Sequence, residues 1–260
     1  MKLKVIDIIP LRLYLIARWY DFKLKRNLYF AELQRKRSRV TDQFSSYKPF
    51  DDTKTIFIHI PKCAGVSINQ ALYGNLAGGH TTLDQYINIF PPSRFQSYYK
   101  FTFVRNPWDR LVSSYIFLKN GGLNSNDSEF FNKELAQFLD FDDFVRGWLT
   151  KENIMKYHHF MPQYKFITDR YFKCSVDYIG YFENIEEDYN FIKTKVGVGR
   201  NLPKINSVKR SRYEDFYSED TKKIVADVYK PDIEIFDYRF EGPRSFVRNI
   251  HPSKVKSYKI

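Results

Sequence analysis

Residues 59–67 carry the first group of side chains whose types and spacing suit chemistry. A β-branched and aromatic run over 55–60 is followed by a lysine, two small residues and a serine. A strand, a turn and a helix N-terminus in this order form an anion site, because unpaired N–H groups and the helix dipole both face the ligand. The segment therefore predicts a phosphate or sulfate site. Its candidate binding residues are Pro61, Lys62, Cys63, Ala64, Gly65, Val66 and Ser67.

Each residue type in this segment has a role in that prediction. Ala64 and Gly65 let the backbone approach the anion, Lys62 supplies a positive charge, and Ser67 adds a hydroxyl from the first helical turn. The lysine precedes the glycine, so the segment is not the G-x-x-x-x-G-K-[ST] pattern of P-loop proteins. The alternative is an ordinary strand-to-helix turn with a solvated lysine.

A second basic motif follows the next apolar run, 101–104. Arg105 stands at the end of this run, and Ser113 lies about two turns into the helix that follows it. An arginine donates several hydrogen bonds to a phosphate in one plane, and a serine hydroxyl can complete the contact. The pair predicts a second anion site. The alternative is that Arg105 and Asp109 cap the helix while Arg110 forms a salt bridge on the surface.

The elements that must position these residues alternate between strands and helices. We expect strands over 55–60, 101–104 and 176–182, and helices over 66–73, 108–118, 138–149, 183–196 and 218–228. Pro107 suits the first position of its helix. Residues 45–52 predict a polar linker, and 74–79 and 121–128 predict loops. This order indicates an α/β domain with a mainly parallel central sheet flanked by helices.

With both motifs in view, the sequence resembles the carbohydrate sulfotransferases that use 3′-phosphoadenosine 5′-phosphosulfate (PAPS). The resemblance is to the branch of the Golgi carbohydrate and heparan 2-O-sulfotransferases and their bacterial relatives. It covers roughly residues 54–240 and extends to His159-x-x-Pro162-Gln163, to 176–184 and to the pattern Tyr229-x-x-Asp232-x-x-x-Phe236-x-Tyr238. It implies a P-loop-like, three-layer sulfotransferase fold, PAPS as donor and adenosine 3′,5′-bisphosphate (PAP) as product.

The resemblance also implies roles for particular residues. Residues 61–67 would hold the 5′-phosphosulfate, with Lys62 at the leaving phosphate, and Arg105 and Ser113 would hold the 3′-phosphate. A late basic segment reaches over the 3′-phosphate in such enzymes, which implies that role for Lys209 and Arg210. The alternative for this late segment is a solvated charged face. The acceptor would be a hydroxyl group of a polysaccharide or glycolipid.

Transfer to a hydroxyl needs an in-line arrangement of the reacting groups, stabilisation of the leaving oxygen and a base. The chain has five histidines from which a base would be chosen. His80 is the first candidate, because a Gly-His at this place is implicated in the heparan enzymes. His159 is the second candidate. We expect His59 to be a packed core residue and His158 an exposed neighbour.

The net charge of +12 is concentrated at the ends of the chain. Residues 1–40 carry +8, residues 241–260 carry +4, and the remainder sums to zero. A neutral body argues against a broad groove along a phosphate backbone, so we expect no nucleic-acid partner. The apolar stretch 5–20 is interrupted by charged residues and a proline, so it is not a convincing spanning helix. Residues 1–40 either lie on an anionic bilayer or pack on their own domain.

Two other classes of protein share parts of this pattern. A P-loop kinase or NTPase would need an acidic residue for Mg²⁺ at the end of a second strand, and no apolar run ends in aspartate there. A non-enzymatic polyanion binder would explain the basic ends but neither motif. A sulfuryl donor can be neutralised by Lys62, Arg105 and backbone amides, so we expect no metal requirement. Cys63 and Cys174 lie outside any zinc-binding spacing.

The predicted organisation has three parts. Residues 1–50 form a basic amphipathic segment and linker, 51–240 a PAPS-dependent sulfotransferase domain, and 241–260 a basic tail. The chain shows neither a clean apolar anchor nor enough cysteines for several disulfides. We therefore expect a cytoplasmic enzyme in peripheral contact with the inner membrane, or a Golgi membrane location if the source is eukaryotic.

Overall fold

A computed structural model describes residues 8–40, 46–202, 212–251 and 255. Lys209 and Arg210, implied above as contacts of a 3′-phosphate, lie outside the described residues. The same holds for the first seven residues of the basic N-terminal segment and for most of the last nine of the C-terminal tail.

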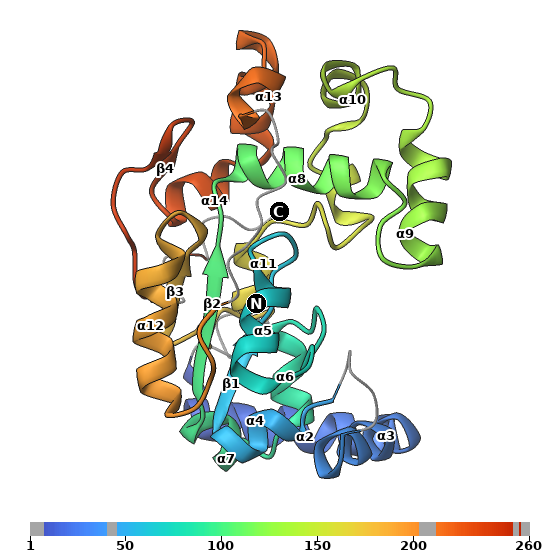
Figure 1. The fold of residues 1–260 in the computed structure, drawn as a ribbon. Helices are drawn as coiled ribbons and strands as arrows, with labels where there is room; N and C mark the ends of the chain where they lie inside the picture. The colour runs from blue at the N-terminus through green and yellow to red at the C-terminus, as the bar shows by residue number, and fades with distance from the viewer. Residues whose placement is uncertain (1–7, 41–45, 203–211, 252–254, 256–260) are drawn as a thin grey trace.

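Three short parallel strands form the central sheet in the order β1 (Thr55–Ile58), β2 (Tyr99–Val104) and β3 (Tyr178–Tyr181). The register pairs Phe57 with Phe101 and Phe103 with Gly180. Nearly every strand residue is buried, which explains why the strands are mainly apolar and aromatic rather than alternating between apolar and polar residues. The carboxyl ends of the strands point toward α8 (Pro107–Lys119), which crosses that end of the sheet (Figure 1).

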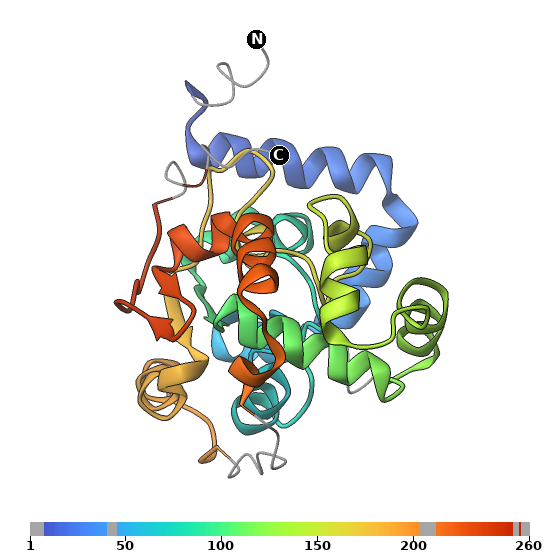
Figure 2. The same ribbon diagram turned by 90° about the horizontal axis from the view of Figure 1, so that it is seen from above.

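Helices surround the sheet. In Figure 1, α12 lies beside β3, and α4 and α7 lie at the end of the sheet where the strands begin. Figure 2, the view from above, shows α2 running along one side of the molecule. The other helices are α2 (Leu11–Lys25), α3 (Asn27–Ser38), α4 (Lys48–Thr53), α5 (Gly65–Tyr73), α6 (Leu83–Ile89), α7 (Pro92–Ser97), α9 (Ser125–Phe130), α10 (Phe141–Trp148), α11 (Tyr164–Ile167), α12 (Ile185–Val196), α13 (Glu219–Val228) and α14 (Lys230–Ile235).

Shorter elements complete the described chain. A π-helical turn follows α9, three short 3₁₀ turns connect other elements, and β4 pairs with β5 in an antiparallel ribbon. Their bounds are Phe131–Leu135 for the π turn, Asn153–Met155, Phe182–Asn184 and Tyr213–Phe216 for the 3₁₀ turns, and Tyr238–Arg239 and Gly242–Pro243 for the strands.

The buried apolar side chains form two clusters. The larger one surrounds the sheet and includes Phe57, Phe101 and Tyr181. The second lies between α8, α10 and α13 and is rich in aromatic rings, with Phe144 stacked on Trp148 at a centroid distance of 5.6 Å. Since α8 contributes most of its length to the second cluster, its first turn is held firmly at the end of β2.

The mixed α/β character, the parallel sheet and the flanking helices were predicted and are confirmed. Pro107 is the first residue of α8, behind Asn106, whose side chain accepts a hydrogen bond from the N–H of Trp108. Ser218 is the N-cap of α13 and forms a capping box with Thr221. The P-loop-like and three-layer character of the fold stays a prediction.

The structure differs from the sequence prediction in two segments predicted as linker or loop, in one helix and in the end of one strand. Residues 48–52 of the predicted linker lie in α4 (Lys48–Thr53), because Pro49 and Phe50 are buried. The predicted loop 121–128 contains the start of α9, which the Asn124 side chain caps by accepting from the N–H of Asp127. Helix α6 was not predicted, although Thr82 and Gln85 form a capping box at its start. Strand β1 ends at Ile58 rather than Ile60.

The two N-terminal helices pack on their own domain, one of the two arrangements considered above. Tyr14 and Leu33 belong to the larger core cluster, and Arg18 forms an ion pair with Asp84 at 2.6 Å. Part of the predicted C-terminal tail also packs, because the Arg248 carbonyl accepts a hydrogen bond from the N–H of Ile179 in β3. Within the described ranges, no helix combines the length and apolar character that crossing a membrane requires.

Candidate active site

The loop between β1 and α5 has the backbone of an anion site. Lys62 and Ala64 both adopt the left-handed conformation, with φ of 67° and 61°, and α5 begins directly afterwards at Gly65. Such alternation turns successive N–H groups toward a common side and is typical of anion-binding nests. The N-cap residue Ala64 makes no side-chain capping bond. The first N–H groups of α5 therefore remain available to a ligand.

Gly65 is required because a buried ring lies directly against it. A Cβ atom at this position would lie 1.8 Å from Cδ2 of His59. The imidazole of His59 is buried and stacked on Phe57, with ring planes 8° apart. His59 is thus a packed core residue, as predicted, and it fixes how closely α5 approaches the end of β1.

The side chains of the loop divide between the interior and the open side. The Lys62 ammonium lies 3.9 Å from the ring centroid of Phe117, and Ser67 is partly exposed. Cys63 instead points inward, where its thiol donates to Oε1 of Gln163 at 3.3 Å. Burial raises the pKa of this thiol to about 12. Cys63 therefore contributes only its backbone to the loop, as do the buried Pro61 and Gly65.

Arg105 joins the two predicted motifs. Its guanidinium is buried and lies against the Phe182 ring. It pairs with Asp109 at 2.7 Å and donates through Nη1 to the carbonyl of Lys62 at 3.0 Å. The second basic motif is thus hydrogen-bonded directly to the loop between β1 and α5, residues 61–67, which we call the anion loop.

Ser113 lies on the same side of α8 as its neighbours at the loop. Asp109, Ser113 and Phe117 follow one another at a spacing of four residues and therefore share a face of the helix. Asp109 holds Arg105 on this face, and the Phe117 ring holds Lys62. The partly exposed Ser113 hydroxyl lies between these two contacts along the helix.

Arg110 lies at the site, although the sequence named it only in the alternative to a second anion site. It was considered as a surface salt bridge, yet its side chain is 2% exposed and bonds two backbone carbonyls. Nε donates to Pro61 O and Nη1 to Met161 O, both at 3.0 Å. Its buried Nη2 has no hydrogen-bond partner within the described part of the chain. Arg110 is the second arginine of the pattern R-N-P-x-x-R that begins at Arg105. This pattern could have marked it as a site residue, but the pattern does not show that the side chain is buried.

The later motifs of the sequence hold the loop after β2. The amide of Gln163 pairs with Arg105 twice, accepting from its N–H at 2.9 Å and donating to its carbonyl at 2.8 Å. Glu183 accepts from the N–H of Asn106 at 2.7 Å. The buried carboxylate of Asp232 accepts from the N–H of Gln163, and its burial raises its pKa to about 6. These matched residues act as positioning residues.

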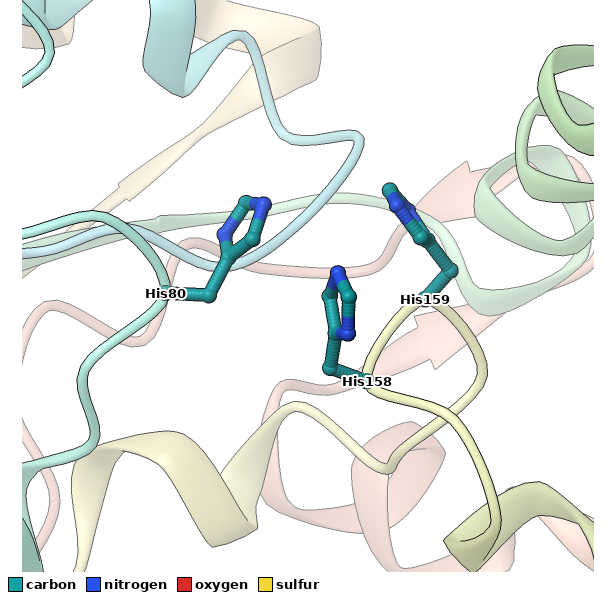
Figure 3. A group of neighbouring side chains, drawn as sticks. All are labelled: His80, His158 and His159. Carbon is teal, nitrogen blue, oxygen red and sulfur yellow. The ribbon is translucent and has the colours of Figure 1, made fainter. Parts of the chain in front are cut away.

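Both candidate bases lie in one cluster of imidazoles beside the loop. The centroid of the His80 ring lies 4.8 Å from that of His158 and 5.8 Å from that of His159 (Figure 3). The centroid of the His59 ring lies 4.4 Å from that of His80. His80 is fixed through Nδ1, which is 3.1 Å from the carbonyl oxygen of His59. His158 is part of the cluster rather than the exposed neighbour that was expected.

The imidazoles are neutral at pH 7. Burial, together with neighbouring positive charge, lowers the pKa values of His80, His158 and His159 to about 4. His159 also faces Asp127, whose carboxylate oxygen lies 3.4 Å from Nε2. An unprotonated imidazole near an anion loop can accept a proton from a bound hydroxyl group.

The site meets the requirements of a ligand with two anionic groups. The uncapped start of α5 and Lys62 would hold one anionic group of the ligand, and Arg105 and Ser113 would hold the other. The unpartnered Nη2 of Arg110 marks unused hydrogen-bonding capacity behind the loop, within the described residues. These residues therefore fit a nucleotide that carries a phosphosulfate and a separate phosphate.

Comparison with known proteins finds distant relatives of two kinds. A protein of Archaeoglobus fulgidus described as uncharacterized is 35% identical over 123 residues, which are 46% of this chain and 85% of that protein. Carbohydrate sulfotransferase 11 of Rattus norvegicus is 25% identical over 185 residues, 60% of this chain and 51% of that enzyme. Carbohydrate sulfotransferase 10 of Xenopus laevis is 24% identical over 189 residues, 56% of this chain and 49% of that enzyme.

The chain thus spans about half the length of these two enzymes. No solved structure matches it. Residues 46–239 match the sulfotransferase family, and this range includes the anion loop, the R-N-P segment, the imidazole cluster and the residues that hold them together. On this match, which covers most of the chain, the protein belongs to the sulfotransferase family.

Proposed function

We propose that this protein transfers the sulfuryl group of PAPS to a hydroxyl group of a carbohydrate acceptor. The observation that carries the proposal is the anion loop itself. Its helix start is uncapped, and its carbonyls at Pro61 and Lys62 are held by Arg110 and Arg105. The imidazole cluster lies beside it, because the Phe117 ring contacts both Lys62 and His159. The family as a whole supports PAPS as donor and PAP as product.

Residues of this chain would hold the donor at both ends. Backbone N–H groups of residues 64–67 and the Lys62 ammonium would bind the 5′-phosphosulfate, which supplies the activated sulfuryl group. Arg105 and Ser113 would bind the 3′-phosphate. Arg110 would keep the loop in its binding conformation, because it bonds the carbonyl of Pro61 from behind.

His80 would serve as the base. Its Nδ1 is held by the carbonyl of His59, so the proton of the neutral ring stays on Nδ1 and the Nε2 lone pair is available. Nε2 of His159 instead faces the carboxylate of Asp127 at 3.4 Å. Lys62 would stabilise the negative charge that develops on the leaving phosphate. The base would thus come from the segment after α5, and the charged group from the loop before α5.

The alternative considered above, a P-loop kinase or NTPase, fits the geometry less well. Glu183 is the acidic residue that follows β3, and both of its oxygens are engaged, by the N–H of Asn106 and by the hydroxyl of Tyr238. Its carboxylate is therefore committed to holding the loop after β2. The residue that ends β2 is followed by an arginine, which suits a second anion rather than a metal ion.

The carbohydrate acceptor is supported by the names of the relatives and is tested by a transfer assay. The protein is incubated with PAPS and, in turn, an unsulfated polysaccharide, a glycolipid, a phenol and a tyrosine peptide, and PAP release is measured. We expect release with a carbohydrate, and its loss in Lys62→Ala but not in Lys48→Ala, a lysine at the other end of the sheet. Release with the phenol or the peptide alone would contradict the acceptor class.

We further propose peripheral contact with an anionic bilayer through α2. Leu13, Tyr20 and Leu24 lie on one face of this helix and are 56%, 52% and 77% exposed. The exposed Arg12 and Lys23 lie along one side of this face. Apolar and basic side chains on one helix suit the headgroup region of an anionic membrane. A cytoplasmic location stays a prediction.

Vesicle sedimentation tests this contact. We expect binding to vesicles of mixed anionic and zwitterionic lipid, little binding to purely zwitterionic ones, and a loss of at least about fivefold in Leu13→Ser/Leu24→Ser. Leu139→Ser is the matched control, because Leu139 is 89% exposed but lies before α10. Equal sedimentation of the double variant and the wild type would refute the contact. Deleting α2 is avoided because its other face is part of the core.

A further inference from the structure

Three imidazoles from two distant parts of the chain meet beside the anion loop. One ring nitrogen from each of His80, His158 and His159 lies within 4.8 Å of the others. Figure 3 shows His80 entering from one loop, and His158 and His159 from another, with their rings directed toward a shared space. The sequence gives no such spacing, because the segments are almost eighty residues apart.

His159 is arranged as a metal-binding histidine is. Its Nε2 faces the carboxylate of Asp127 at 3.4 Å. Asp127 is itself held by the hydroxyl of Tyr157 at 2.5 Å and by the N–H of Leu123 at 2.8 Å. This leaves Nδ1 of the buried His159 with no hydrogen-bond partner among the described residues. A carboxylate behind one nitrogen and an open second nitrogen is the usual arrangement of a ligand and its outer-shell partner.

His80 shows the same division of its two nitrogens. Nδ1 lies 3.1 Å from the carbonyl oxygen of His59, which leaves Nε2 as the available ligand atom. No acidic residue is required as a ligand, since Asp127 acts from behind His159.

We propose that His80, His158 and His159 form a binding site for one Zn²⁺ ion. Three nitrogen ligands favour Zn²⁺ over Mg²⁺ and Ca²⁺, which prefer oxygen ligands. A tetrahedral site with Zn–N bonds of the usual length places ligand nitrogens about 3.3 Å apart, which small rotations of the three rings would reach from their present separation. The fourth position stays open to water or to a ligand bound at the anion loop.

The site has a consequence for catalysis that rests on the proposed function. Zn²⁺ would take the Nε2 lone pair of His80, which the base needs in order to accept a proton. Zn²⁺ would therefore inhibit sulfuryl transfer without displacing PAP, because the nucleotide is held by the loop and by Arg105. The metal would act as an inhibitor of the enzyme rather than as its cofactor.

Calorimetric titration of the chelator-treated full chain with ZnCl₂ tests the site directly. We expect one Zn²⁺ per chain, a raised melting temperature, and at least tenfold weaker binding in His158→Ala. His251→Ala is the matched control, because His251 lies outside the cluster and its loss should leave binding unchanged. Titration with Co²⁺ adds a spectroscopic readout, since a nitrogen-rich tetrahedral site gives visible absorption bands that should disappear in His158→Ala.

Two results would overturn the proposal. One is the absence of stoichiometric Zn²⁺ binding to the wild type, and the other is equal binding by the wild type and by His158→Ala. If His158→Ala fails to fold, as judged by circular dichroism, His158→Gln replaces it, since that side chain keeps a polar group at the site. Binding is measured without donor or acceptor, so failure of the zinc site and failure of the sulfotransferase assignment are separate outcomes.

Discussion

Replacing Gly65 by alanine should weaken PAP binding by about 100-fold, the equivalent of losing two charge-assisted hydrogen bonds. The new Cβ would lie 1.8 Å from a ring carbon of His59, which is buried and stacked on Phe57. The start of α5 must therefore move away from β1. We also expect the free energy of unfolding to fall by about 2 kcal/mol, a typical cost of overpacking. Calorimetry with PAP and thermal unfolding measure the two effects.

The control for this prediction lies at the other end of the same helix. Gly74 ends α5 with φ of 70°, and a Cβ there would meet no atom within 4 Å. Gly74→Ala should cost about 1 kcal/mol of stability through its left-handed backbone and leave PAP binding unchanged. Similar losses of PAP binding in the two variants would mean that α5 responds as a whole, and the local role of Gly65 would be refuted.

Replacing His80 by alanine should lower kcat about 10²- to 10⁴-fold while leaving the Kd for PAP within a factor of two or three, because general base catalysis contributes on this scale. In the proposed donor site the nucleotide would be held by the loop and by Arg105, whose guanidinium donates to the carbonyl of Lys62, and His80 would make no contact with its phosphates. Single-turnover transfer to the acceptor, alongside PAP calorimetry, separates the chemical step from binding. His80→Ala should thus lose chemistry and keep affinity.

The pH profile supplies a second readout of the same base. The free enzyme holds the pKa of His80 at about 4, mainly through burial. The base loses activity only when it is protonated, so kcat/KM should stay level as the pH falls from 7 to about 5 and drop as it passes through about 4. An acid limb near pH 6.5 would indicate a base that is not desolvated. A full loss of transfer in His159→Ala with full activity in His80→Ala would make His159 the base.

The parts of the fold that were predicted depend on strong local signals. Strand β1 and residues 101–104 of β2 are β-branched and aromatic runs, and Pro107 and Ser218 occupy positions that begin helices. The short helices α4 and α9 escaped prediction because their polar and turn-forming residues favour loops locally. Their form is decided by tertiary burial, as at Phe50 in α4.

The same division holds for the candidate site. Lys62, Gly65 and Arg105 follow the ends of predicted strands, and parallel strands bring their carboxyl ends to one edge, so a shared site could be foreseen. Arg110 could not be assigned, because an arginine four residues into a helix is usually exposed, and only the packing of α8 buries it. The histidine cluster could not be predicted from the sequence. It forms where two loops approach each other, and no local pattern links His80 to His158 and His159.

Calorimetric titration with PAP in buffer containing EDTA is the most direct test of the proposal that the β1–α5 loop is the donor site. We predict binding of one PAP per chain without metal, at least tenfold weaker binding in Arg105→Ala, and unchanged binding in Arg94→Ala, whose arginine lies in α7 at the opposite end of the sheet. Arg105→Lys guards against misfolding, since it keeps a charge near Asp109 but loses the planar contact. No PAP binding, combined with Mg²⁺-dependent stabilisation by ATP, would contradict the account and favour a kinase.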